Sequence, residues 1–153
     1  MGVFKTTVAL VALAYGILIV LCSLNIGDRM AGKECGKAAT QANNGLIVMG
    51  GVMMAMSISY LACQYTYSSC GSGAQSENMN LSLFSISMIL VSIVCITLAS
   101  IVENNTDCID PHVATQAIWI PGIIILFLGL ILGATQINAF NKVMTSVNTF
   151  VNM

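Results

Sequence analysis

The charged residues are confined to short stretches of the chain, and their distribution limits the possible folds more than any other feature. Four long stretches contain no Asp, Glu, Lys or Arg: residues 6–27, 38–76, 78–102 and 111–141. Each contains a continuous apolar run, and a helix needs about 17–25 such residues to cross a hydrocarbon core. The sequence therefore predicts four membrane-spanning segments, near residues 7–25, 45–64, 81–102 and 113–133.

The composition agrees with this prediction. Hydrophobic residues make up 57% of the 153 residues and charged residues only 7%, whereas a soluble domain has about 25% charged residues. Lipid offers no partners to backbone N–H and C=O groups, and the alternating pattern of a membrane barrel is absent. We therefore expect an all-α fold, a four-transmembrane-helix bundle of two tandem helical hairpins. The net charge of −1, without a basic block, gives no indication of nucleic-acid binding.

Four spans place both termini on one side of the membrane, together with the loop at 65–80. The loops at 26–44 and 103–112 lie on the other side, and the first of them carries three cations: Arg29, Lys33 and Lys37. The positive-inside rule favours a cytoplasmic position for that side. Cysteines in the same loops favour an oxidising compartment, because disulfides persist there. The orientation is therefore left open.

The two halves of the chain resemble each other. Cys22 and Cys35 are 13 residues apart, as are Cys95 and Cys108, and the second pair follows the first by 73 residues. The same tetrapeptide, Ala-Thr-Gln-Ala, occurs at 39–42 and at 114–117, before the second span of each half. This order of features predicts an internal repeat. Both halves would enter the membrane in the same direction, as parallel repeats do.

The spacing of these four cysteines leaves more than one disulfide pattern open. Cys35 and Cys108 lie on the same side and can pair with each other. Each can instead pair with the cysteine that ends the preceding span, Cys22 or Cys95. The alternative for Cys22 and Cys95 is that they are small apolar residues of the core.

Two further cysteines, Cys63 and Cys70, lie near the opposite face and can form a disulfide of their own. None of the six belongs to a Cys-x-x-Cys pair, the spacing that four-helix membrane oxidoreductases use to tune thiol reactivity. Redox catalysis is therefore not expected.

No catalytic, cofactor-binding or metal-binding set can be assembled from the sequence. The predicted spans contain no ionisable Asp, Glu, Lys or Arg, which argues against ion pumps and proton-coupled transporters. His112 is expected in a solvated loop. Met49 and Met53 lie one helical turn apart and could pass Cu(I), but flexible packing residues are the more common use of methionine. We expect neither an enzyme nor a small-molecule substrate.

Small residues indicate where helices approach each other closely. Gly129 and Gly133 form a G-x-x-x-G pair in the fourth span. Gly51, Ala55 and Ser59 form a small-residue stripe in the second span. We expect both sets at helix–helix contacts within the bundle.

The last segment, 137–153, differs from the membrane domain, 1–136. Apolar residues recur in it at steps of three and four: Ile137, Phe140, Met144, Val147 and Val151. This pattern predicts an amphipathic helix that extends the fourth span. A helix over 113–152 would be about 60 Å long and would project from the bilayer. With one charge, the segment is better suited to docking on protein than on lipid, and the three cations of the first loop are further docking candidates.

One resemblance to known proteins rests on the second span. It opens with Asn-Asn-Gly-Leu-Ile-Val-Met-Gly at 43–50 and closes with Ser-Ile-Ser-Tyr-Leu-Ala-Cys at 57–63 and Cys70. These residues resemble small multi-span proteins of large icosahedral DNA viruses, such as the chlorella viruses, which keep a membrane beneath the capsid. The resemblance implies a minor capsid protein that tethers the virion inner membrane to the shell, with lipid and other capsid or membrane proteins as partners.

Two other functions remain as alternatives. One is a cellular four-span scaffold or adaptor, and the other is a homo-oligomeric channel. A channel needs polar groups along its path. The candidates within the spans are few: Ser57, Ser59, Ser85, Ser87, Ser92 and Thr97.

Overall fold

A computed structural model describes the chain except residues 1, 66–73, 107 and 152–153, and describes no side chains at 2, 74–79 and 136–151. Four α-helices follow one another, and the described residues contain no strand: α1 (Gly2–Met30), α2 (Lys37–Tyr65), α3 (Ala74–Asn105) and α4 (His112–Val151). Each contains a segment long and apolar enough to cross a membrane: Val3–Met30, Lys37–Tyr65, Asn80–Asn105 and His112–Thr135. The predicted all-α, four-span fold is confirmed.

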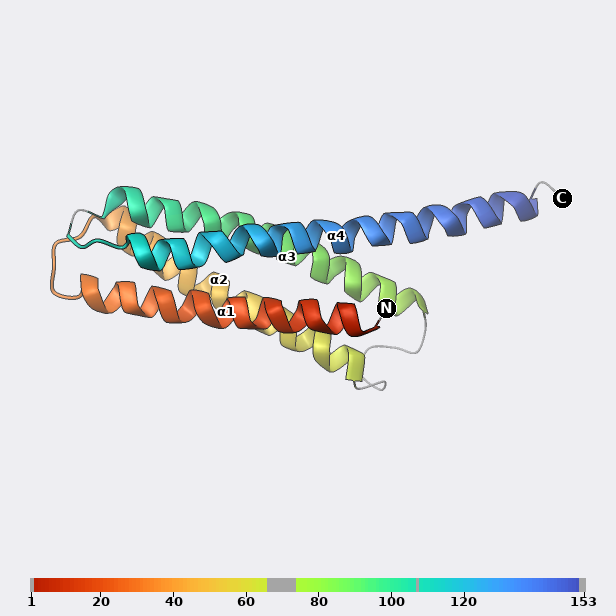
Figure 1. Cartoon of the computed structure of the whole chain (residues 1–153), viewed down its shortest axis with the longest axis horizontal. Helices are drawn as coiled ribbons and strands as arrows, with labels where there is room; N and C mark the ends of the chain where they lie inside the picture. The colour runs from red at the N-terminus through yellow and green to blue at the C-terminus, as the bar shows by residue number, and fades with distance from the viewer. Residues whose placement is uncertain (1, 66–73, 107, 152–153) are drawn as a thin grey trace.

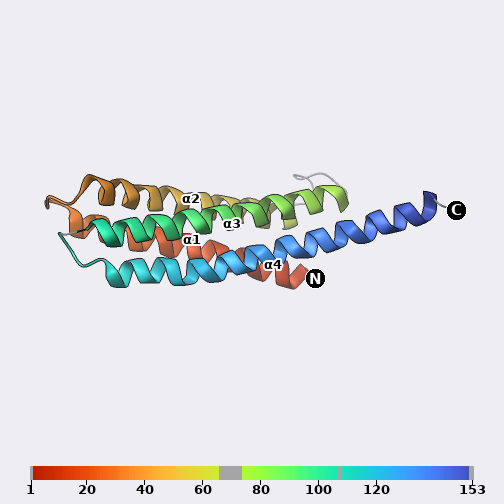
Figure 2. The ribbon, with the colours of Figure 1, turned by 90° about the horizontal axis from the view of Figure 1, so that it is seen from above.

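The helices form an elongated bundle in which neighbours along the chain run antiparallel (Figure 1). α1 packs against α2, α2 against α3 and α3 against α4, and the ring closes with a smaller contact between α1 and α4. The connections 31–36 and 106–111 lie at one end. The N-terminus lies toward the other end, where the last part of α4 continues past the ends of α1, α2 and α3 (Figures 1 and 2).

The helices reach further into the first loop than the sequence predicted. The expected loop at 26–44 shrinks to 31–36, because α1 continues to Met30 and α2 already begins at Lys37. Polar residues at these ends keep their helical hydrogen bonds instead of breaking the helix. Gly32, with φ 74°, follows α1 at the position where a left-handed residue commonly terminates a helix.

Large apolar side chains fill the centre of the bundle, and others cover its outside. Among the fully buried side chains are Ile19, Leu46, Met53, Met88, Ile118 and Ile125. The outward faces carry exposed apolar residues such as Leu21, Val48, Leu90 and Phe127. Since lipid is as apolar as this core, close packing and hydrogen bonds must hold the helices together.

Glycines allow two pairs of helices to approach closely. On α1 and α2, a Cβ on Gly16 would lie 3.0 Å from the carbonyl oxygen of Gly50, and a Cβ on Gly50 would lie 3.0 Å from that of Gly16. On α4, a Cβ on Gly129 would lie 3.0 Å from Ile89 of α3, and one on Gly133 would lie 3.1 Å from the Ser85 hydroxyl of α3. Both residues of the G-x-x-x-G pair therefore lie at the α3–α4 contact.

The small-residue stripe of α2 requires a correction. No atom lies within 4 Å of a Cβ placed on Gly51, and Ala55 and Ser59 are exposed. The glycine that packs against another helix is the preceding one, Gly50. One residue turns a helix by about 100°, so two adjacent glycines face different directions, and the sequence does not say which one meets the neighbour.

Candidate functional site

Polar and charged groups gather at the end of the bundle that holds both short connections. We call this end the head and define it as residues 27–44 and 103–116, of which 107 is not described. It consists of the last turns of α1 and α3, the first two turns of α2, the first turn of α4 and the connections between them. It contains a disulfide, the single histidine of the chain and a network of hydrogen bonds.

The disulfide joins Cys35 to Cys108, with 5.4 Å between their Cα atoms. It links the α1–α2 connection to the α3–α4 connection, and thus one hairpin to the other. Cys22 and Cys95 are free thiols, Cys95 buried and Cys22 half-buried. Of the two pairings that the sequence left open, the one across the hairpins is confirmed.

Cys63 is also disulfide-bonded. Cys70, with which the sequence allowed it to pair, lies outside the described residues. The predicted repeat remains a prediction, and its two tetrapeptides lie in different surroundings. The Thr40 hydroxyl is exposed and bonds to the carbonyl of Gly36 at 3.4 Å, whereas the side chain of Thr115 is buried.

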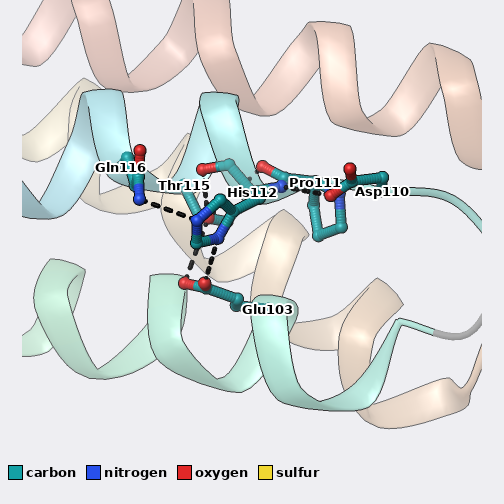
Figure 3. A network of polar contacts seen from close by, with 6 residues as sticks. All are labelled: Glu103, Asp110, Pro111, His112, Thr115 and Gln116. Carbon is teal, nitrogen blue, oxygen red and sulfur yellow. Dashed lines mark hydrogen bonds and ion pairs between the residues drawn. The ribbon is translucent and has the colours of Figure 1, made fainter.

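A network of polar contacts connects the end of α3 to the start of α4 (Figure 3). The imidazole of His112 donates from Nδ1 to one carboxylate oxygen of Glu103, and Thr115 donates to the other at 3.2 Å. On the far side of the ring, Gln116 Nε2 lies 2.8 Å from His112 Nε2 and donates to it. The backbone N–H of His112 donates to Asp110 Oδ1 at 3.1 Å. Both ring nitrogens and the backbone N–H of His112 therefore have partners.

The expectation for His112 is corrected in one respect: its side chain is exposed, as predicted, but the residue does not lie in a loop. His112 is the first residue of α4, and although its side chain is 55% exposed, Glu103 and Gln116 hold the ring on both sides. The carboxylate of Glu103 lies at the start of α4, where the helix dipole and the free N–H groups favour negative charge. Glu103 thus stabilises the beginning of a helix to which it does not belong.

The three cations in and beside the first connection remain available to a partner. Arg29, Lys33 and Lys37 are all exposed, and none makes an ion pair with a described residue. Asp28 and Glu34 are exposed in the same stretch, so the surface carries both signs of charge. The sequence identified these cations as docking candidates, and they lie at the end of α1, in the connection and at the start of α2.

At the inner edge of the head, Asn43 joins α2 to α1. Its amide nitrogen donates to the carbonyl oxygen of Ser23 at 3.0 Å, and its side chain is 3% exposed. Its Oδ1 and the Ser23 hydroxyl are buried without a hydrogen-bond partner among the described residues. The sequence placed Asn43 in a loop, and only the early start of α2 brings it into the helix contact.

Two hydrogen bonds tie α4 to other helices deeper in the bundle. Tyr15 of α1 donates its hydroxyl to the carbonyl of Ile118 at 3.1 Å. Ser85 of α3 donates to the carbonyl of Gly129 at 2.7 Å. No sequence signal predicts the first bond, because a tyrosine within a span does not reveal which helix it faces.

The polar residues considered for a channel do not line a path through the bundle. Ser57, Ser87 and Thr97 donate to carbonyls of their own helices, four residues earlier. Ser85 donates to a carbonyl of α4, Ser92 is buried, and Ser59 is exposed on the outer face. Large apolar side chains occupy the space between the helices, so a single bundle contains no polar route across the membrane in its described part.

The described residues contain no group of three or more His, Cys, Asp or Glu side chains that could hold a metal ion. The docking residues predicted near the C-terminus, Ile137, Phe140, Met144, Val147 and Val151, belong to the part of α4 whose side chains lie outside the described set. No family model, curated protein or solved structure matches the chain.

Proposed function

We propose that this protein is a structural membrane protein that holds a protein layer against the bilayer it spans. The observation that carries the proposal is the length of α4. It has 40 residues, whereas a membrane-spanning helix takes about 17–25. At least about 15 residues, or roughly 22 Å at 1.5 Å per residue, therefore extend beyond the hydrocarbon core.

The extension, which we define as residues 136–151, is suited to contact with protein. It is rich in Asn, Thr, Ser, Val and Phe, which are poorer helix formers than Ala, Leu or Lys. In proteins, most of the stability of a helix comes from the packing of its apolar face and not from the propensities of its residues. Lys142 is its single charge, so attraction to anionic lipid would be weak. A packing partner would supply the stability that the segment lacks on its own.

The rest of the molecule suits an anchor. The outer faces of the four helices are apolar and would fix the chain in the bilayer. The disulfide and the Glu103–His112 network brace the head, where Arg29, Lys33 and Lys37 are exposed. Docking at the head and docking at the extension would act on opposite sides of the membrane.

For the viral proteins that the second span resembles, the bilayer would be the inner membrane of the virion and the protein layer the capsid shell. On this proposal the chain is a minor capsid protein. Support for the virion comes from that resemblance, and support for anchoring comes from the shape of α4. A channel formed within one chain is not favoured, because large apolar side chains fill the centre of the bundle, and Ser57, Ser87 and Thr97 donate to carbonyls of their own helices.

The proposal can be tested by crosslinking mass spectrometry on the native membrane or particle, without reductant, using an amine-reactive crosslinker. We expect crosslinks from Lys142, or from Lys33 and Lys37, to one other protein at fixed stoichiometry. A Lys142→Arg variant keeps the charge but removes the reactive amine, so it should lose only the crosslinks of the extension. If these lysines link only to copies of the same chain, the anchoring function is wrong.

A further inference from the structure

We propose that the chain is a substrate of thiol oxidation on both faces of its membrane, so that neither face borders a reducing cytosol when the protein is at work. This property is independent of the anchoring function, because it concerns the membrane in which the protein works and not what the protein holds there.

Disulfide-bonded cysteines lie at both ends of α2. The Cys35–Cys108 disulfide precedes the start of α2 at Lys37, whereas Cys63, which is also disulfide-bonded, lies in the last turn of α2 before Tyr65. At 1.5 Å per residue, the helix rises about 39 Å from Lys37 to Cys63, which exceeds the hydrocarbon core of about 30 Å. α2 runs from the end that holds both connections toward the opposite end (Figure 1). The two disulfides therefore lie at opposite faces of the membrane.

The cysteines that remain thiols lie between these two levels. Cys22 and Cys95 are free, and each lies well inside a candidate membrane span, Val3–Met30 for the first and Asn80–Asn105 for the second. Disulfides form by attack of a thiolate, and an apolar environment disfavours that charge. The oxidation state of these cysteines thus follows their depth, as expected if oxidants reach the chain from the aqueous phase on each side.

Each disulfide needs an oxidant on its own side of the membrane. In thiol–disulfide exchange, two cysteine thiols give two electrons and two protons to the disulfide of a donor, which leaves as two thiols. The cytosol keeps thiols reduced, whereas secretory compartments and the surfaces of cells and virions are oxidising. A cellular membrane that borders the cytosol therefore supplies such a donor on one face only. A membrane enclosed in a particle outside the cell has no reducing face.

Oxidation on both faces also reconciles two opposing signals at the head. Arg29, Lys33 and Lys37 favour a cytoplasmic head, and the Cys35–Cys108 disulfide favours an oxidising compartment. The positive-inside rule acts while the chain inserts, whereas a disulfide forms whenever its surroundings become oxidising. The two signals agree once the membrane has left contact with the cytosol.

Differential alkylation of the full chain in its native membrane tests the proposal. The membrane is denatured in a light maleimide that traps thiols, then reduced and treated with a heavy maleimide, and each cysteine is read by mass spectrometry. The heavy label should exceed the light label at least about tenfold at Cys35, Cys108 and Cys63. Cys22 and Cys95 should carry the light label, and they control for oxidation during preparation.

The same chain expressed in a cellular membrane with one cytosolic face provides the comparison. There, one of the two disulfides should become light and the other should stay heavy, and the light one identifies the cytosolic face. Cys63→Ser should leave the labels of Cys35 and Cys108 unchanged, because the two faces are oxidised independently, and Cys22→Ser is the matched control at a free thiol.

Two outcomes would overturn the proposal. One is a light label at either disulfide in the native membrane, which would mean that one face is reducing there. The other is a heavy label at both disulfides in the cellular membrane, which would mean that they do not report the conditions at the two faces. The anchoring function is tested separately by crosslinking, so a chain that is oxidised on both faces but retains no second protein would contradict only the anchor.

Discussion

A Cβ placed on Gly122 of α4 would lie 2.6 Å from the hydroxyl oxygen of Tyr15 of α1. The absence of a side chain at this glycine is what allows Tyr15 to reach the backbone of α4 and donate to the carbonyl of Ile118. α1 and α4 form the smallest of the four helix contacts in the ring. This pair of residues therefore closes the bundle where its packing is least extensive.

Substitution of Gly122 by Ala should destabilise the bundle by about 1–3 kcal/mol, the usual cost of overpacking. Tyr15→Phe alone should cost about 0.6 kcal/mol, a typical value for a hydrogen bond between transmembrane helices. Removal of the Tyr15 hydroxyl also removes the atom that the added methyl group would meet, so the double variant should be more stable than Gly122→Ala alone. The unfolding free energies of the two single variants and the double variant can be measured in mixed micelles. If the losses of the single variants simply add up in the double variant, the contact between Gly122 and the Tyr15 hydroxyl is contradicted.

The two adjacent glycines of α2 provide a matched pair. Gly50→Ala should destabilise the protein by about 1–3 kcal/mol, because the added methyl group meets the backbone of α1 at Gly16. Gly51→Ala adds the same methyl group where no atom lies within 4 Å and should be neutral or slightly stabilising. Thermal unfolding in detergent distinguishes them. Equal losses for both variants would mean that α2 is rotated relative to the structure described.

The disulfide should make the largest single contribution of the head to the stability of the protein. It closes a loop with a sequence separation of 73 residues, for which chain entropy predicts about 4 kcal/mol of stabilisation. Cys35→Ser and Cys108→Ser should each lose this amount, and the double variant should lose no more than either. Cys22→Ser, at a free thiol, is the control. Counting thiols in the unfolded, unreduced protein provides the check: Cys108→Ser should free the Cys35 thiol and raise the number by one, whereas a number lower by one would mean that Cys108 was unpaired.

Glu103→Gln should loosen the start of α4. The substitution keeps the size of the side chain but removes the charge that His112 and the N-terminus of α4 share. Because the pair is partly exposed, we expect a loss of only about 0.5–1 kcal/mol. Amide hydrogen exchange should be faster at the first turn of α4 and unchanged in the middle of α3. Asp28→Asn, at an exposed carboxylate in the same head, should leave both regions unchanged.

The sequence predicted where the helices lie along the chain, but not which side of each helix packs against its neighbours. Long uncharged runs are a strong signal because lipid excludes charge and unpaired backbone groups, and all four predicted spans lie within observed helices. The choice between Gly50 and Gly51 depended on how α2 is rotated. A sequence that is apolar on all sides does not determine that rotation.

The sequence predicted only part of the head, for a related reason. Cys35 and Cys108 were expected on the same side of the membrane, so they could pair. Cys22 and Cys95 could not be excluded as their partners, because a distance along the chain does not determine a distance in space. His112 was assigned to a loop because polar residues beside a span resemble loops. The structure shows instead that His112 begins α4, where its ring contacts Glu103 of another helix.

The most direct test of the anchoring function compares the full chain with a chain that ends at Gln136, both expressed in the native membrane. Both should insert and form the Cys35–Cys108 disulfide, since spans and head are intact. We predict that the full chain retains a second protein at fixed stoichiometry, crosslinked through Lys142, and that the shortened chain retains at least about tenfold less of it, as expected when the main contact is removed. Equal retention by both chains would show that α4 does not hold the protein layer.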